Sequence, residues 1–193
     1  DYSQIELRLL AHIAGDTEMQ AAFRSGEDFH TVTASRVFHV EPQEVTPEMR
    51  RRAKAVNFGI VYGISAFSLA QDIGVSVAEA KAYMERYFET YQGVRQYMTD
   101  VVAKAEQDGY VQTLMHRRRA LPELKSSNFN MREFGKRVAL NMPVQGTAAD
   151  IMKLAMVRVH HRLKREGLRA RLLMQVHDEL IVECPASERE QVE

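Results

Sequence analysis

Apolar side chains recur at helical spacing through most of this chain, whereas strand-like stretches are short and few. Near the start, Ile5, Leu9 and Ile13 lie four residues apart and predict one buried helical face. Similar patterns predict helices from residue 3 to the glycine at 15, up to 23, over 30–38, 47–62 and 76–91, up to about 107, and over 130–141 and 147–166. Strands are predicted at 1–2, 110–115, after a basic turn at 116–119, and at 170–176 and 179–184. This layout indicates an α+β fold.

Residues that favour helix ends set several of these boundaries. Ser3 and Glu6 form a capping-box pair for the first helix, and Asp28 can cap the third. Thr46-Pro47-Glu48 predicts the start of the 47–62 helix, with Gly63 as its end. Pro143 is expected to separate the 130–141 and 147–166 helices. A further capping-box pattern at 187–190 predicts another helix start near the last residue.

The predicted 47–62 helix carries a stripe of four side chains at four-residue spacing. Arg50, Lys54, Phe58 and Tyr62 run from cation to aromatic along one face. A nucleoside triphosphate has the same polarity, because its phosphates are anionic and its base is flat. Guanidinium and ammonium groups suit phosphate oxygens, and aromatic rings suit a base or sugar. The alternative is an ordinary amphipathic helix with aromatic residues in the core.

Two details of the same helix favour the ligand hypothesis. Ala53, Val56 and Ile60 form a separate apolar face that can pack without Phe58 or Tyr62. In addition, a glycine at position 59 is unfavourable inside a helix by about 1 kcal/mol relative to alanine. We therefore expect some group to lie close to the backbone at this glycine.

Composition adds little until the placement of charge is considered. The 193 residues are 45% hydrophobic, and 26 basic residues balance 26 acidic ones. Fourteen Lys and Arg face four Asp and Glu over 110–171, whereas one basic residue faces six acidic ones over 172–193. This asymmetry is compatible with a polyanion track beside a carboxylate metal site, or with a solvated surface.

Other global features exclude some classes of protein. The single Cys184 excludes an intramolecular disulfide and a multi-cysteine zinc site, and we expect a reducing, cytoplasmic setting. No apolar run is long enough to span a membrane, and no signal peptide is visible. The absence of an initiator methionine and the unfinished helix start near residue 187 suggest part of a longer protein.

Carboxylates occur where the predicted strands would hold them rigidly and exposed. Asp178 follows His177 at the tip of the predicted 170–184 hairpin, with Glu179 beside it, and Asp1 lies at a strand end. If these strands share a sheet, Asp1 and Asp178 come together and favour a divalent cation between them. Oxygen ligands favour Mg²⁺, and two such ions would serve a phosphoryl or nucleotidyl displacement. His-Asp in a turn is also common without any function, and Glu6 could be only a helix cap.

Three spaced motifs give the chain a close resemblance to the polymerase region of family A DNA polymerases, over essentially its whole length. The motifs are Asp1-Tyr2-Ser3-Gln4-Ile5-Glu6-Leu7-Arg8, Arg50-x3-Lys54-x3-Phe58-Gly59-x2-Tyr62-Gly63 and Val176-His177-Asp178-Glu179. Arg137, Asn141 and the run 145–150 also match family positions. The resemblance implies part of a right-hand polymerase: palm at 1–24 and 142–193, built on an antiparallel sheet, and mostly helical fingers at 25–141.

The resemblance also implies roles for individual residues. Asp1, the carbonyl of Tyr2 and Asp178 would bind two Mg²⁺ ions, with Glu179 as a supporting catalytic carboxylate. The nucleotide-binding set would be Gln4, Glu6, His30, Arg50, Lys54, Phe58 and Tyr62. Within it, Lys54 would donate a proton to the leaving pyrophosphate, and Glu6 would be the steric gate against a ribose 2′-hydroxyl. The primer-template contacts would be Tyr62, Gly63, Arg137, Asn141, Gln145 and His177.

The implied reaction is template-directed DNA synthesis, in which a primer 3′-hydroxyl attacks the α-phosphate of a deoxynucleoside triphosphate (dNTP). This would make the parent protein a transferase of DNA replication and repair, with primer-template DNA and dNTPs as partners, no membrane, and a monomeric state. Closure of the 47–62 helix over the correct pair would be an induced-fit step. Alternatives are a single-subunit RNA polymerase, a DNA-binding fragment without catalysis, and a two-metal nuclease, which would not need the stripe.

Overall fold

The computed structural model describes residues 4–193, so the strand end predicted at residues 1–2 lies outside the described residues. The described chain is mostly helical, with two small antiparallel sheets, which confirms the α+β class. Its α-helices are α1 (Ile5–Ile13), α2 (Thr17–Arg24), α3 (Phe29–Phe38), α4 (Pro47–Val61), α5 (Ala66–Ile73), α6 (Val77–Thr90), α7 (Gln92–Asp108), α8 (Phe129–Arg165) and α9 (Arg189–Val192). Its strands are β1 (Tyr110–Gln112), β2 (Arg118–Ala120), β3 (Arg171–Val176) and β4 (Glu179–Glu183). Three 3-10 turns cover Pro42–Glu44, Pro122–Lys125 and Ala186–Glu188.

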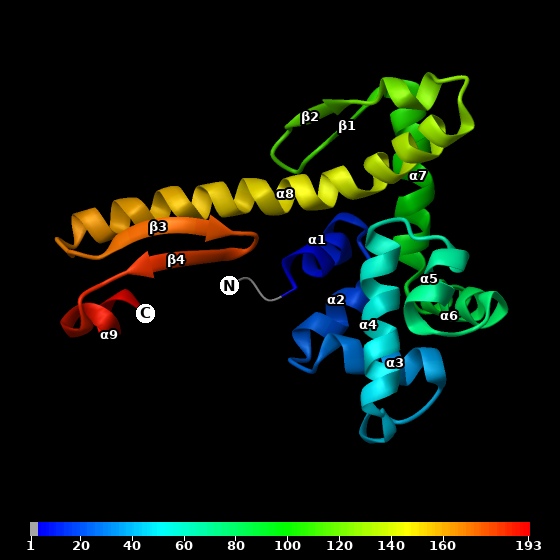
Figure 1. Cartoon of the computed structure of the whole chain (residues 1–193), viewed down its shortest axis with the longest axis horizontal. Helices are drawn as coiled ribbons and strands as arrows, with labels where there is room; N and C mark the ends of the chain where they lie inside the picture. Colours follow the sequence, from blue (N-terminus) through cyan, green and yellow to red (C-terminus); the bar gives the residue numbers. More distant parts are fainter. Residues whose placement is uncertain (1–3) are drawn as a thin grey trace.

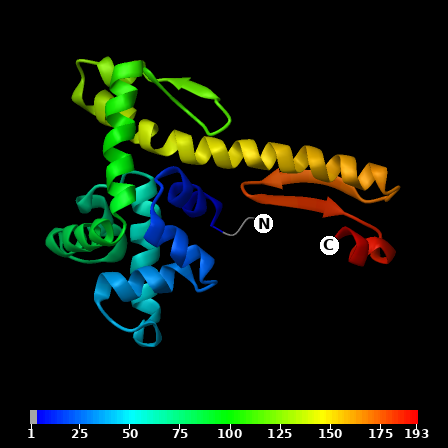
Figure 2. The same cartoon turned by 180° about the vertical axis from the view of Figure 1, so that it is seen from behind.

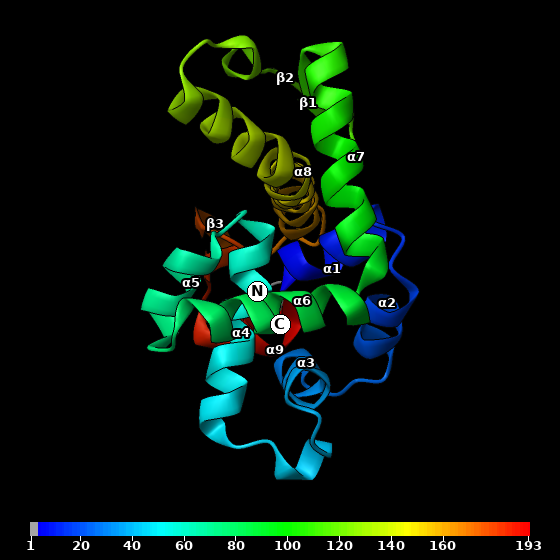
Figure 3. The same ribbon diagram turned by 90° about the vertical axis from the view of Figure 1, so that its right-hand side faces the viewer.

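Helix α8 runs across the molecule and joins two unequal parts (Figure 1). The β3–β4 hairpin lies along its C-terminal half, and helices α2 to α6 form a separate body beyond its other half (Figures 1 and 2). Helix α1 packs against both α4 and α8, so it lies between the hairpin and the helical body. A view nearly along α8 shows α7 beside it (Figure 3).

The main core fills the helical body and the contact of α1 with its neighbours. Leu7, Phe29, Val56, Tyr87 and Tyr91 are almost completely buried there. The predicted apolar face of α1 packs into this core as expected, with its last member only partly buried. A smaller cluster joins α7, β1 and α8 around buried residues 105, 111, 121, 124 and 139. The site described below lies along the side of the larger core.

Helix α4 has the ends that the sequence predicts. The Thr46 hydroxyl accepts a hydrogen bond from the amide of Met49 at 3.2 Å. At the other end Gly63 has φ +67°, its amide donates to the carbonyl of Ile60, and the Ile64 amide donates to the carbonyl of Gly59. These two bonds form a Schellman motif, which requires a left-handed residue such as glycine. The motif fixes the end of α4 at Tyr62, its C-cap residue.

The predicted break at Pro143 is wrong, because α8 continues through this residue without interruption. A proline inside a helix loses one hydrogen bond and costs about 3 kcal/mol. Here Ala139, Pro143 and Val144 are buried, so packing on both sides offsets that cost. The hydroxyl of Thr147 also donates to the Pro143 carbonyl. The helix changes direction along its length instead of ending (Figure 1).

Other local features bear on the predicted helix starts. Helix α5, capped by Ser65, was not predicted. Helix α1 begins after Gln4, which has φ +56° and makes no side-chain cap, and Ser3, the predicted partner of Glu6 in the capping box, lies outside the described residues. A helix does start close to the box predicted at 187–190, as α9, but its N-cap is Glu188, which makes no side-chain cap and accepts hydrogen bonds from the backbone amides of residues 169 and 170.

No helix within residues 4–193 combines the length and the apolar character needed to cross a membrane.

Candidate functional site

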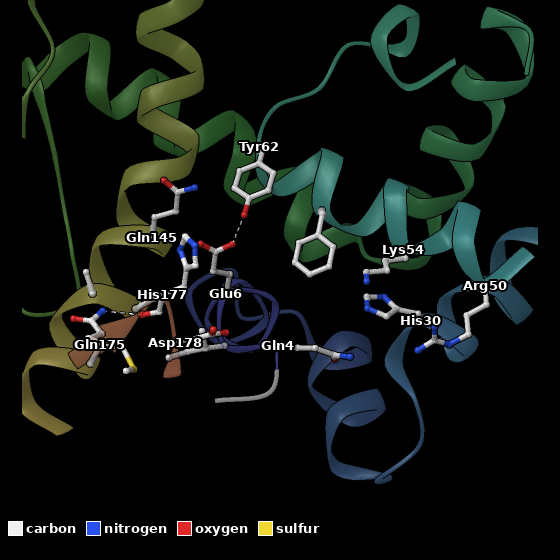
Figure 4. A pocket seen from close by; sticks show the side chains of 15 residues that line it. Gln4, Glu6, His30, Arg50, Lys54, Tyr62, Gln145, Gln175, His177 and Asp178 are labelled. Carbon is white, nitrogen blue, oxygen red and sulfur yellow. Dashed lines mark hydrogen bonds between the residues drawn. The ribbon is translucent and has the colours of Figure 1, made fainter. Parts of the chain in front are cut away.

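Residues from five separate elements line one cavity of about 530 Å³. Helices α1, α3, α4 and α8 and the β3–β4 hairpin contribute its walls. The lining residues are Gln4, Ile5, Glu6, His30, Arg50, Lys54, Phe58, Tyr62, Gln145, Ala148, Ala149, Met152, Gln175, His177 and Asp178. Figure 4 shows the labelled polar side chains facing this space from both sides. The structure therefore brings the predicted stripe, Glu6 and the hairpin tip into one site.

The stripe on α4 lies where the ligand hypothesis places it. Ala53, Val56 and Ile60 are 1–2% exposed and pack into the core, as predicted. Tyr62 is 39% exposed, and Phe58 is only partly buried, with its ring 5.7 Å from the ring of His30. The two aromatic side chains are therefore available to the cavity.

The close neighbour expected at Gly59 is part of the chain itself. A Cβ added at Gly59 would lie 2.7 Å from Cγ2 of Ile64. This contact belongs to the Schellman motif that ends α4, because Ile64 folds back over the last turn. The glycine thus leaves room for Ile64 at the end of the helix.

Arg50 and Lys54 differ in their pairing. The guanidinium of Arg50 donates two hydrogen bonds to Asp28, at 2.9 Å and 2.8 Å, in a bidentate ion pair. These bonds hold the pKa of the Asp28 carboxyl far below its usual range. Asp28 also accepts from the amide of Thr31 and so caps α3, as predicted. Lys54 forms no ion pair within the part of the chain that the structure describes.

His30 lies on the cavity wall but is only 3% exposed. The amide nitrogen of Asn57 lies 3.0 Å from Nδ1 of His30, beneath the cavity surface. Burial lowers the pKa of His30, and the positive charges of Arg50 and Lys54 act in the same direction against the opposing effect of Asp28. The ring is therefore neutral at physiological pH.

Glu6 has a partner that the sequence does not reveal. The hydroxyl of Tyr62 donates a 2.6 Å hydrogen bond to the Glu6 carboxylate, across 56 positions of sequence (Figure 4). Burial raises the pKa of Tyr62 to about 12, and the adjacent carboxylate contributes to the rise. An aromatic residue of α4 thus holds the carboxylate in place.

The hairpin tip presents its residues in a constrained backbone. Strands β3 and β4 pair in antiparallel register, with Val176 opposite Glu179, as predicted. His177 has φ +53°, and its carbonyl accepts a hydrogen bond from the side chain of Gln175 at 2.7 Å. His177 and Asp178 line the cavity, whereas Glu179 is exposed and does not.

The metal prediction rests in part on residues that the structure does not describe. Asp1 and Tyr2 lie outside the described residues, so their approach to Asp178 stays a prediction. Within residues 4–193, no group of three or more His, Cys, Asp or Glu side chains is placed to hold a metal ion. Asp178 is the one predicted metal ligand that the structure places in the cavity.

The predicted primer-template contacts fall into three places. Gln145 and His177 line the main cavity, and Tyr62 contributes to it as well. Tyr62, Gly63 and Arg137 line a second cavity of about 470 Å³ along α4 and α5. Asn141 lines neither cavity, and its Oδ1 is buried without a hydrogen-bond partner among the described residues.

Sequence reasoning missed two residues that support this site. Asn57 is completely buried on the packing face of α4, four residues after Ala53. A polar side chain on an otherwise apolar helical face is the signal that could have revealed it. Asp28 was read only as a helix cap, and nothing in the sequence indicates its bond to a residue 22 positions away.

Comparisons with known proteins agree with the motifs. A family model described as DNA polymerase family A matches residues 1–193. DNA polymerase I of Bacillus caldotenax is 58% identical over 192 residues, and that of Bacillus subtilis (strain 168) is 58% identical over 193 residues. Each alignment covers 100% of this chain but only 22% of the relative. This chain therefore spans about a fifth of the length of these relatives.

A solved structure also matches the fold of this chain closely. The POL domain of Pol1 from M. smegmatis, in complex with DNA primer-template and dNTP, has a TM-score of 0.95 and 52% sequence identity. The match covers 100% of this chain and 34% of that one. The arrangement of partial palm and mostly helical fingers that the motifs imply is thus the fold of a known polymerase domain. The chain belongs to DNA polymerase family A.

Proposed function

We propose that the 530 Å³ cavity binds a dNTP and that this chain carries the nucleotide site for template-directed DNA synthesis. One observation carries the proposal. Along α4, two cations and then two aromatic side chains face a cavity whose opposite wall holds Asp178. This order matches the polarity of a nucleotide, with its phosphates toward Arg50 and its base toward Tyr62. The structural neighbour from M. smegmatis, a complex with DNA primer-template and dNTP, supports the same assignment.

The phosphate end of the site would use three donors. Arg50, Lys54 and His30 line the same end of the cavity. Since Asp28 already occupies Arg50 in a bidentate pair, phosphate oxygens would share or displace that carboxylate. Lys54 would also deliver a proton to the leaving pyrophosphate, because its ammonium group has no carboxylate partner among the described residues.

The sugar and base end would use aromatic and carboxylate groups. Phe58 and Tyr62 would form the platform for the base, and Gln4 would contact the nucleotide from the opposite wall. Glu6 would act as the gate against a ribose 2′-hydroxyl, because its bond to Tyr62 fixes the carboxylate at the cavity wall. A gate must be rigid to exclude one additional oxygen atom.

The donors proposed for the metal site suit Mg²⁺. Asp178 supplies a carboxylate oxygen at the cavity, and Asp1 and the Tyr2 carbonyl would supply further oxygen ligands, with Glu179 in support. Two bound Mg²⁺ ions would neutralise charge on the phosphates and favour the ionised primer 3′-hydroxyl.

Primer-template DNA would run along the basic part of the chain. We assign Arg137, Asn141, Gln145 and His177 to this surface, together with Gly63 at the end of α4. Residues 1–24 and 142–193 would belong to the palm, and residues 25–141 to the fingers. A cytoplasmic location and a monomeric state stay predictions from the sequence.

Primer extension with Asp178→Ala and Lys54→Ala variants tests this function. The variants should be assayed in the 193-residue chain and in a full-length family A polymerase that carries it. We expect Asp178→Ala to abolish extension, and Lys54→Ala to slow incorporation far more than it weakens DNA binding. Asp100→Ala and Lys81→Ala, at two exposed residues that do not line the cavity, are matched controls that should retain activity.

The same assay separates the alternatives. Substantial synthesis by Asp178→Ala would contradict the metal assignment. Preference for ribonucleotides would favour an RNA polymerase, and DNA binding without extension in the full-length protein would favour a binding module. Degradation of the primer without use of dNTPs would favour a nuclease.

A further inference from the structure

A buried chain of polar side chains leads from the core to the cavity. It contains Tyr91, Thr33, Asn57 and His30, and all four are at most 3% exposed. The Tyr91 and Thr33 hydroxyls lie 3.2 Å apart, and the Thr33 hydroxyl lies 3.3 Å from Oδ1 of Asn57. The amide nitrogen of Asn57 then lies 3.0 Å from Nδ1 of His30. Helix α3, helix α4 and the junction of α6 and α7 therefore hold one imidazole ring together.

The direction of each hydrogen bond follows from what each group can donate. Thr33 donates its one hydroxyl hydrogen to the Asn57 carbonyl, so Tyr91 must donate to Thr33. With its oxygen thus engaged, the Asn57 amide presents N–H to His30. Nδ1 of His30 must accept this bond, which leaves the proton of the neutral ring on Nε2.

We propose that Asn57 is a positioning residue that fixes His30 in the Nε2–H tautomer, so that this N–H donates to a phosphate oxygen of the bound nucleotide. The inference rests on the proposed function, in which the cavity accepts the triphosphate at this end. The opposite tautomer would turn a nitrogen lone pair toward the phosphates and repel them. A protonated ring would place an Nδ1–H against the N–H of Asn57, so the same contact disfavours the imidazolium ion.

The surrounding charges do not replace this control. Asp28 faces His30 from its own helix and favours a proton on the ring, whereas Arg50 and Lys54 face it from α4 and oppose one. Burial is the largest influence and also opposes the charged ring. These influences keep the ring neutral but cannot choose between its two tautomers, because only a directional hydrogen bond distinguishes Nδ1 from Nε2.

The first test reads the ring directly and needs no nucleotide. Nitrogen-15 NMR of the histidine side chains, with His30→Gln to assign the signal, reports which ring nitrogen carries the proton. We expect the Nε2–H tautomer in the unaltered chain. Asn57→Asp replaces the donor with an acceptor, so we expect Nδ1 to become protonated. An Nδ1–H tautomer in the unaltered chain would overturn the inference.

The second test measures nucleotide use in a full-length polymerase that carries the chain. For Asn57→Leu we expect the KM for dNTP to rise about ten-fold, because the hydrogen bond from His30 to a charged phosphate oxygen is lost. This change is equivalent to about 1.4 kcal/mol. In a His30→Gln background the same change should have little effect, because the group it positions is gone. An equal loss in both backgrounds would show a merely structural role and overturn the inference.

Two further measurements keep the test decisive. If Asn57→Leu does not fold, Thr33→Val removes the bond that orients Asn57 and should raise the KM in the same direction, and an unchanged KM would contradict the inference. Asn57→Asp should make dNTP binding depend on pH near the usual pKa of histidine, unlike the unaltered protein, and a pH-independent KM in this variant would contradict the inference. If the unaltered polymerase binds no dNTP, the proposed function fails, while the NMR result still decides the tautomer.

Discussion

Gly59 lies beneath Ile64 at the end of α4, and replacing it with alanine sets two known effects against each other. Alanine is favoured over glycine inside a helix by about 1 kcal/mol. However, the new Cβ would lie 2.7 Å from Cγ2 of Ile64, about 0.7 Å closer than the 3.4 Å at which ordinary contacts begin. Ile64 cannot move away freely, because its amide is bonded to the Gly59 carbonyl at 2.8 Å.

The contact should therefore outweigh the gain in helix propensity. Overpacking of this kind costs about 1–3 kcal/mol, so we expect Gly59→Ala to lower the free energy of unfolding by about 1 kcal/mol net. Because Ile64 follows directly on Tyr62 and Gly63, its displacement should also disturb the Schellman motif. The measurement is denaturant unfolding of the chain followed by circular dichroism, with equal m-values as a check on two-state behaviour.

An Ile64→Ala background supplies the control. Without Cγ2 the contact disappears, so Gly59→Ala should stabilise that variant by up to about 1 kcal/mol. The sign of the effect therefore reverses between the two backgrounds. Destabilisation by the same amount in both would refute the reasoning, since it would show that the glycine is required for something other than the space under Ile64.

Three further perturbations test other contacts of the site. Tyr62→Phe frees the Glu6 carboxylate and should reduce discrimination against ribonucleotides in primer extension by up to about ten-fold, because a hydrogen bond to a charged group contributes about 1.5 kcal/mol. Unchanged discrimination would contradict the proposal that Glu6 is a rigid gate. Asp28 has a lowered pKa in the fold, so its contribution to stability is complete above its ordinary pKa near 4 and is lost as the pH falls further. The difference in unfolding free energy between the unaltered chain and Asp28→Asn should therefore shrink between about pH 5 and pH 2. A constant difference would contradict the pairing with Arg50. Asp150→Ala leaves the Thr113 hydroxyl and the Arg117 guanidinium, both in the β1–β2 turn, without their buried acceptor, and should lower the free energy of unfolding by about 2–3 kcal/mol in thermal or denaturant unfolding. Asp150→Asn should lower it less, because it keeps an acceptor for the hydroxyl.

Local signals in the sequence were reliable where a helix end depends on its own residues. The Thr46 cap, the Asp28 cap and the Gly63 stop all form as predicted, because each needs only a side chain and a backbone within a few positions. The apolar face of α4 packs as its period predicts. The stripe of cations and aromatics follows from the same period, so its exposure to a cavity was predictable as well.

Predictions failed where a distant group competed with a local one. The bond from Tyr62 to Glu6 joins residues 56 positions apart, and Glu188, the N-cap of α9, is bonded to the segment before β3 without capping its own helix. Pro143 did not end a helix, because burial of its neighbours on both sides offsets the lost hydrogen bond. In each of these places, packing across the fold decided between two locally acceptable arrangements.

The sequence by itself determined the family, the positions of most helices and the order of chemical groups along α4, since motifs and periodicity are properties of the chain. Only the tertiary structure decided which groups work together. It placed Asp178 across a cavity from Arg50 and Lys54, joined Asp28 to Arg50, and bonded Asn57 to His30. Such pairings depend on the packing of helices far apart in sequence, and no local propensity encodes the few ångströms that separate a hydrogen bond from no contact.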